Sequence, residues 1–213
     1  YGAAFTFTIP ANAFSDVDAG QTLSISANGL PAGIALDAAS RTLSGKPALV
    51  GSFTVTITVT DSGVPALSAT ASFAIAIAKA PLTVTADNAA RDYGQNNPLL
   101  TGALVGVVNN DKLAATYSTT AVTNSPVGTY PIIPGLFDLD WRLANYTVTQ
   151  NNGTLTVRNV PPVVNAGPDQ EKVAGDEVTF AGSFADPSSP SHVVGWDFGD
   201  GSAPVIGTLT PKH

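Results

Sequence analysis

The stretch from Gly51 to Gly63 constrains the fold more than any other part of the sequence. It reads Gly-Ser-Phe-Thr-Val-Thr-Ile-Thr-Val-Thr-Asp-Ser-Gly, and apolar residues alternate with threonine from Phe53 to Thr60. Successive side chains of a β-strand point to opposite faces, so one face of this strand is apolar and the other is a row of hydroxyl groups. The apolar face needs a second sheet to cover it. The stretch therefore predicts one strand of a β-sandwich.

Residues 1–80 contain several shorter runs of the same kind, separated by turns rich in Gly, Pro and Asn. Regularly spaced short strands joined by such turns are typical of a sandwich, and the run from Ala69 to Ile77 is the predicted neighbour of the Thr-rich strand. A chain of 213 residues suits two or three modules of roughly 80 residues each. We therefore expect an all-β, elongated chain of tandem sandwich modules with a mostly-β module in the middle.

Three carboxylates lie in or beside predicted loops of the first module. Asp61 ends the Thr-rich strand, and Asp16 and Asp18 lie upstream in a loop that contains Gly20. If the fold brings these loops together, their oxygens form a hard-cation site, because Ca²⁺ takes six to eight oxygen ligands. The alternative is that Asp16 and Asp18 cap a turn and that Asp61 ends a strand. Both interpretations stay open at this point.

The charge balance argues against nucleic acid as a partner. The formal net charge is -7, and the 9 Lys and Arg residues are spread along the chain. Nucleic-acid binding requires clustered basic residues. No apolar run reaches the roughly 18 residues of a membrane span, so no span is predicted. Methionine is absent, which leads us to expect a piece of a longer protein.

No motif for catalysis stands out. Cysteine is absent, which excludes thiolate metal sites and thiol nucleophiles. The run 197–199 spells the Asp-Phe-Gly of kinases but lacks the other kinase motifs. His192 and His213 are the only histidines, and neither lies in a triad motif. We therefore predict that the chain is not an enzyme.

The middle segment, residues 81–157, has a different order of predicted strands and turns. It holds a Tyr93-Gly94 pair in a turn cluster, and residues 106–113 predict one short helical turn capped by Asn110 or Asp111. Near its end, the turn at residues 151–153 predicts a β-hairpin.

The first segment resembles cadherin repeats. Residues 16–18, 36–37 and 59–65 are similar to their D-x-D, L-D-R-E and A-x-D elements. With Gly-Leu-Pro at 29–31 and Leu-Ser-Gly-Lys-Pro at 43–47, the segment resembles the cadherin-like Putative Ig modules of large bacterial surface proteins. The resemblance implies that Asp16, Asp18 and Asp61 bind Ca²⁺ at the junction with a preceding domain.

The two other segments resemble other families of bacterial surface modules. The order of motifs in residues 81–157 is similar to the MBG family of the YGX type, which implies a mostly-β spacer with no catalytic residues. Residues 195–201, Gly-Trp-Asp-Phe-Gly-Asp-Gly, resemble the signature of PKD domains, which are Ig-like sandwiches. Some PKD domains bind Ca²⁺ near the loop that Asp186 occupies, so Asp186 is a weaker metal candidate.

The third segment, residues 158–213, is shorter than a whole PKD module. We expect its remaining strands to come from the rest of a longer polypeptide or from another copy by β-strand addition, which would build a fibre.

These resemblances imply a spacer segment of an extracellular or cell-surface bacterial adhesin, stiffened by Ca²⁺, whose partners are neighbouring modules or further copies. The alternative is a carbohydrate- or protein-binding accessory module of a secreted enzyme, acting through exposed aromatic residues such as Tyr130, Trp141 and Tyr146. Core packing is the competing interpretation for Trp141.

Overall fold

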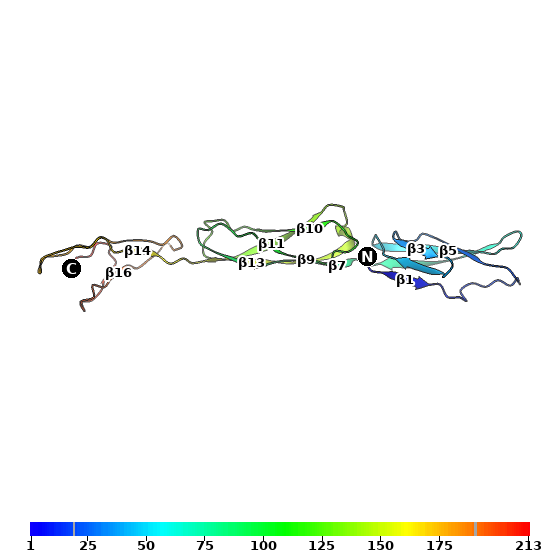
Figure 1. Cartoon of the computed structure of the whole chain (residues 1–213), viewed down its shortest axis with the longest axis horizontal. Coiled ribbons are helices and arrows are strands. Elements are labelled where there is room, and N and C mark those ends of the chain that lie inside the picture. Colours follow the sequence, from blue (N-terminus) through cyan, green and yellow to red (C-terminus); the bar gives the residue numbers. More distant parts are fainter. Residues whose placement is uncertain (19, 190) are drawn as a thin grey trace. The chain divides into compact units, whose positions relative to one another are not determined.

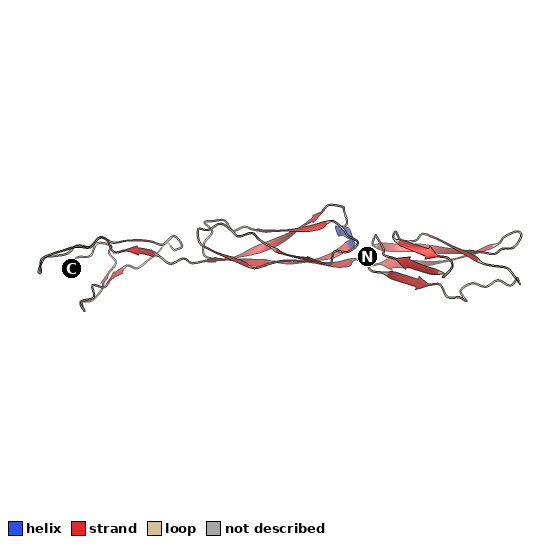
Figure 2. Cartoon of the chain, viewed as in Figure 1, coloured by secondary structure: helices blue, strands red, loops and turns tan. Residues whose placement is uncertain are grey.

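The computed structural model describes residues 1–213 except residues 19 and 190, and the chain is almost entirely β (Figure 2). The predicted all-β class is confirmed. Residues 1–85, 102–116 and 134–151 form one compact unit, and residues 86–101, 117–133 and 152–213 form a second. No helix among the described residues is long and apolar enough to cross a membrane.

The first segment is a sandwich of two three-stranded sheets, with strand orders β1-β4-β3 and β2-β5-β6 (Figure 1). The buried side chains of both sheets form one apolar core, with Leu43 and Val55 fully enclosed. Its strands are β1 (Phe5–Thr8), β2 (Ser24–Asn28), β3 (Ile34–Asp37), β4 (Thr42–Gly45), β5 (Gly51–Thr60) and β6 (Ser68–Ile77).

Strand β5 follows the alternation of its sequence. Val55, Ile57 and Val59 are buried, and the threonines between them lie on the other face. The hydroxyl groups of that face pair with those of β6, with Thr56 Oγ1 2.8 Å from Ser72 Oγ. The antiparallel pairing of β5 with β6 confirms the predicted neighbour.

The middle segment has two sheets, with strand orders β10-β11-β13-β8 and β12-β7-β9. Its apolar residues form two clusters, one around Leu155 and Ile132 and the other around Leu82 and Tyr146. Its elements are β7 (Ala80–Ala86), β8 (Ala89–Asp92), β9 (Gly102–Val105), β10 (Leu113–Thr119), β11 (Gly128–Asp138), the 3₁₀ turn η1 (Leu143–Asn145), β12 (Tyr146–Asn151) and β13 (Gly153–Arg158).

Two local predictions for the middle segment are wrong. Strands β12 and β13 do not form a hairpin, because β12 pairs in parallel with β7 while β13 pairs with β11 and β8. The predicted helical turn at residues 106–113 is a tight turn in which Asn109 and Asn110 have φ angles of 55° and 58°. Two successive asparagines with positive φ are typical of a type I′ turn rather than of a helix.

Residues 158–213 form two separate two-stranded sheets, which pair β14 (Val163–Asn165) with β15 (Ser183–Ala185) and β16 (Gly195–Trp196) with β17 (Val205–Ile206). Aromatic rings gather around Trp196 of β16: the ring centroid of Phe180 lies 5.6 Å from that of Trp196 and 5.2 Å from that of Phe198. Both Trp196 and Phe198 remain half-buried.

Candidate functional site

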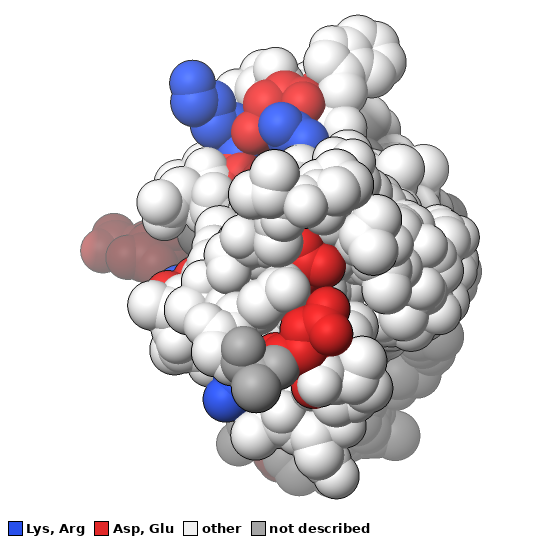
Figure 3. All heavy atoms as spheres, turned by 90° about the vertical axis from the view of Figure 1, so that its right-hand side faces the viewer, with Lys and Arg blue, Asp and Glu red and all other residues white. Residues whose placement is uncertain are grey.

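The predicted calcium loops meet at one end of the first sandwich. Asp16 and Asp61 line the same open hollow of about 380 Å³, together with apolar and serine side chains. The end of the sandwich that Figure 3 turns toward the viewer carries acidic side chains grouped around its middle. The fold therefore brings two of the three predicted carboxylates to one place.

Hydrogen bonds within the loops already occupy part of these carboxylates. Asp61 Oδ1 accepts the backbone N–H groups of Gly63 at 2.9 Å and Leu67 at 3.0 Å. Asp16 Oδ1 accepts the N–H of Asp18 at 2.9 Å. Such bonds are how aspartate fixes turns, so Asp16 and Asp61 each hold their own loop, and Asp61 directly follows the last residue of β5.

Gln21 is a residue of this site that the sequence did not point to. Its Nε2 donates to Asp18 Oδ2 at 3.4 Å, while its Oε1 is buried and has no hydrogen-bond partner in the described chain. A Cβ atom at Gly63 would lie 3.0 Å from Gln21 Oε1 and 3.2 Å from Asp61 Oδ1, so both oxygens adjoin the same glycine. A glutamine after an acidic loop is no sequence signal, and only the packing of the two loops reveals it.

The donor chemistry of these loops fits a hard cation, because carboxylate and amide oxygens are ligands of Ca²⁺. Within the described residues, however, no three His, Asp or Glu side chains lie close enough together to hold a metal ion. The loops therefore offer suitable oxygens without a closed set of ligands.

Asp186 has protein partners instead. Its Oδ1 accepts the hydroxyl of Ser188 at 2.7 Å and the N–H of Ser188 at 2.9 Å, and its Oδ2 lies 3.8 Å from His192 Nδ1. These hydrogen bonds, the Ser188 hydroxyl foremost, lower the pKa of Asp186. The acceptors within reach of the Ser188 hydroxyl are Asp186, Asn159 and Val160 and not His192, so the described residues here lack the nucleophile–base pairing of a triad.

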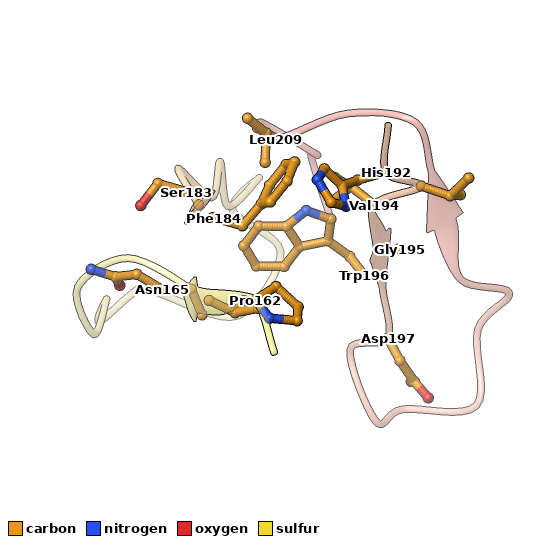
Figure 4. A pocket seen from close by; sticks show the side chains of 14 residues that line it. Pro162, Asn165, Ser183, Phe184, His192, Val194, Gly195, Trp196, Asp197 and Leu209 are labelled. Atoms are coloured by element: carbon orange, nitrogen blue, oxygen red, sulfur yellow. The ribbon is translucent and has the colours of Figure 1, made fainter. Parts of the chain in front are cut away.

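An apolar hollow of about 390 Å³ lies beside Trp196 in the third segment (Figure 4). Phe184, His192 and Leu209 line it with the indole, and Pro162 closes another side. Residues of β14, β15 and β16 line the hollow, and within the described part of the segment each of these strands pairs with one neighbour.

A second carboxylate site lies where the first and middle segments meet inside one compact unit. The hydroxyls of Tyr1 and Tyr146 both donate to Asp111 Oδ2 at 2.6 Å. The two rings contact each other edge to face, with centroids 5.4 Å apart, and Tyr146 is only 3% exposed. The Tyr146 hydroxyl also accepts the N–H of Val108 at 3.1 Å. We call Tyr1, Asp111 and Tyr146 the junction cluster.

Further hydrogen bonds accompany the junction cluster. Pro47 O accepts the N–H of Gly2 at 3.1 Å and the side-chain amide of Asn109 at 3.1 Å. The buried Asn145 accepts the N–H of Val50 through its Oδ1 at 3.2 Å. The two segments are therefore joined by direct contacts at three points besides the covalent chain.

The electrostatics of the junction cluster favour protonated tyrosines. Burial, followed by the hydrogen bond to Asp111, raises the pKa of Tyr146 and of Tyr1. A neutral phenol is the form that donates to a carboxylate, so the cluster stays intact at neutral pH. These groups are suited to holding two segments together and not to exchanging protons near pH 7.

The aromatic residues named for ligand binding differ in exposure. Tyr146 is buried in the junction cluster, so its predicted exposure is wrong. Tyr130 packs against the core around Leu155 and donates to Pro126 O at 2.8 Å. Trp141 is 89% exposed, which favours the surface-loop interpretation over core packing.

Known protein families match all three segments. The family described as Putative Ig domain matches residues 1–78, the MBG domain (YGX type) matches residues 82–156, and the PKD domain matches residues 159–213. No protein with curated annotation matches the sequence. The three resemblances seen in the sequence are confirmed, and none of the three families is catalytic.

Several solved structures of cadherin ectodomains are similar at low identity. The Protocadherin GammaB4 extracellular domain matches at 13% identity and a TM-score of 0.28, over 90% of this chain and 45% of that one. The human Desmocollin-1 ectodomain matches at 12% identity and a TM-score of 0.27, over 84% of this chain and 44% of that one. The chain thus spans less than half the length of these structures.

Proposed function

We propose that this tandem array of Putative Ig, MBG and PKD modules is a spacer segment of a large extracellular bacterial surface protein. Ig-like and PKD modules are typical of extracellular proteins, and in this proposal their sandwiches space other parts of a longer chain. In this proposal the module boundaries fall near residues 80 and 158, between the matched ranges.

The junction cluster carries this proposal. A spacer needs fixed joints, and the default between modules is relative motion unless their interface is well packed. Here a buried tyrosine, a second tyrosine and a shared carboxylate tie the first module to the middle one. The side chains of Asn109 and Asn145 add to the joint through their hydrogen bonds to Pro47 O and to the N–H of Val50. A direct protein joint of this kind needs no cation.

The absence of cysteine makes a direct test of the joint simple, because spin labels attach only at introduced cysteines. We would label Ser26→Cys and Leu139→Cys, two exposed positions of the same compact unit, and measure the distance distribution by pulsed electron resonance. We expect a narrow distribution that EDTA leaves unchanged and that Asp111→Ala broadens. A broad distance distribution in the labelled protein that keeps Asp111 would refute the spacer function.

We also propose that Asp16, Asp18 and Asp61 hold a Ca²⁺ ion that orders the other end of the first module, with Gln21 Oε1 as a further oxygen. Strand β5 separates Asp61 from the junction cluster by about 30 Å, since each residue of a strand advances about 3.3 Å. A cation there would stiffen the two loops and not this joint. Asp186 is the lesser candidate for Ca²⁺, because Ser188 and His192 already engage it.

Calcium binding is tested by thermal melting with and without Ca²⁺. Free ligand at one hundred times its dissociation constant would stabilise the native state by about 2.7 kcal/mol. We expect EDTA to lower the melting temperature of the first module, and Asp18→Asn to abolish this response. Identical melting curves in Ca²⁺ and in EDTA would remove the cation from the proposal.

Further copies of the chain or its neighbouring modules are the proposed partners of the third segment. The open edges of its two-stranded sheets and the hollow beside Trp196 support strand addition, because an unpaired edge offers free backbone groups. Analytical ultracentrifugation distinguishes the two sources: association that grows with concentration indicates copies, and a monomer at all concentrations indicates neighbouring modules.

A further inference from the structure

The loop after β11 exposes a tryptophan in a strained backbone conformation. Trp141 has a φ angle of 59° and is 89% exposed. Bulky residues rarely adopt positive φ, and a large apolar side chain gains nothing from contact with water. Residues held in such conformations cluster at sites that contact ligands.

Hydrogen bonds fix this loop on both sides of the tryptophan. Asp138 accepts the N–H groups of Arg142 at 2.9 Å and Leu143 at 2.8 Å, one on each carboxylate oxygen. Asp140 Oδ2 accepts the N–H of Lys112 at 3.0 Å, and the N–H of Leu139 donates to Lys112 O at 3.2 Å. The indole is therefore presented by a loop whose position is set before any ligand arrives.

The same loop holds a second unusual feature. Asp140 Oδ1 is buried and has no hydrogen-bond partner among the described residues. Buried acceptors are nearly always paired, so an unpaired one needs an explanation. A strained φ and an unpaired acceptor in adjacent residues point to a site and not to a connector.

The surroundings of Trp141 favour one class of ligand. Leu139 and Phe137 are also exposed, at 70% and 55%. Three such side chains offer a few hundred Å² at most, below the roughly 800 Å² that each partner of a stable protein complex buries. The carboxylates of Asp138 and Asp140 oppose a polyanion.

A neutral sugar ring suits this surface. Its C–H face stacks on the negative face of an indole, and its hydroxyls both donate and accept hydrogen bonds. The next residue along the loop, Arg142, carries a guanidinium whose N–H groups are hydrogen-bond donors. We propose that Trp141 is the contact residue of a binding site for neutral oligosaccharides, which gives this module a recognition role beyond spacing.

The test is titration of the whole chain with cellohexaose, chitohexaose and mannohexaose. Calorimetry measures the affinity of each variant. A Trp196→Phe background lets tryptophan fluorescence report on Trp141 alone. We expect saturable binding to at least one of them, weakened about tenfold or more by Trp141→Ala and largely kept by Trp141→Tyr. Leu99→Ala is the matched control, since Leu99 is 88% exposed in another loop.

Loss of folding does not confuse this test, because truncating an exposed side chain should leave the melting temperature unchanged. Binding that Trp141→Ala does not weaken overturns the proposal. So does an absence of binding to all of these sugars at millimolar concentration, or a change in self-association with no change in sugar binding. None of these outcomes bears on the joint between the first two modules, which the spin-label distances test separately.

Discussion

Two carboxylate sites in the same compact unit show how differently aspartate is used. At the end of the first sandwich, Asp61 accepts N–H groups from its own loop, from residues two and six positions away. At the junction, Asp111 accepts the hydroxyls of Tyr1 and Tyr146, from 110 and 35 positions away. The first site is local and open, and the second joins distant segments. The acidic motif therefore marks a loop, whereas the contact between the segments depends on a single aspartate in a turn outside that motif.

The largest expected effect on stability comes from the junction cluster. Replacing Asp111 with Ala removes the charged acceptor that the Tyr1 and Tyr146 hydroxyls share, and leaves Tyr146 only the carbonyl of Val108 at 3.1 Å. A hydrogen bond to a charged group contributes about 1.5 to 3 kcal/mol, so we expect a loss of about 2 to 3 kcal/mol in the unfolding transition of the first module. Urea denaturation measures it.

The control for this prediction is Asp169→Ala, which changes an exposed aspartate of the third segment. We expect a change within about 0.5 kcal/mol for it. Equal losses for the two variants would mean that the junction cluster contributes nothing to stability.

The junction cluster also makes the stability of the fold depend on pH in the alkaline range. Burial and the hydrogen bond to Asp111 raise the pKa of Tyr146 above its unfolded value of about 10. A raised folded-state pKa gives stability that is fully present below about pH 10 and is lost as pH rises through the folded-state pKa. Melting temperatures from neutral to strongly alkaline pH should therefore fall steeply in the unsubstituted protein and less steeply in Tyr146→Phe. Parallel curves would exclude Tyr146 as the titrating group.

A smaller effect on stability is expected at Asp61, at the end of the first sandwich. Asp61→Ala removes the acceptor of two backbone N–H groups and should cost about 1 kcal/mol, as the loss of a capping side chain does. Asp61→Asn keeps an Oδ1 acceptor and should cost less. Both are measured in EDTA, so that no cation contributes. If Asn costs as much as Ala, the negative charge and not the capping geometry stabilises the loop.

The smallest effect concerns Trp141 in its left-handed conformation. Asparagine tolerates positive φ better than tryptophan does, so Trp141→Asn should raise stability by up to about 1 kcal/mol. Trp141→Ala keeps most of the backbone strain and serves as the control. Thermal melting that ranks Asn at or below Ala would show that the strain is not stored at this residue.

The sequence predicted the strand periods well and the long-range partners poorly. The alternation of Phe53 to Thr60 was sufficient to predict both faces of β5, and the following run correctly predicted β6. The hairpin at residues 151–153 failed because local turn chemistry does not say which sheet the next strand joins. Gly153 lies so close to the backbone of Asp87 that no Cβ fits there, a constraint set by a segment far away in the chain.

The candidate sites divide in the same way. Asp16, Asp18 and Asp61 were visible because their spacing matches a known motif, whereas Gln21 joins them only where the two loops pack. Asp111 gave a misleading local signal as a helix cap, and nothing near it in the sequence indicates Tyr1 or Tyr146.

By itself, the sequence determined the β class, the module families and the apolar faces of the strands, because a period of two residues is a property of neighbours along the chain. Only the tertiary structure decided which carboxylate joins two modules, which tryptophan is exposed to solvent and which strands share a sheet. These depend on contacts between residues tens of positions apart, whose identity a local pattern does not encode.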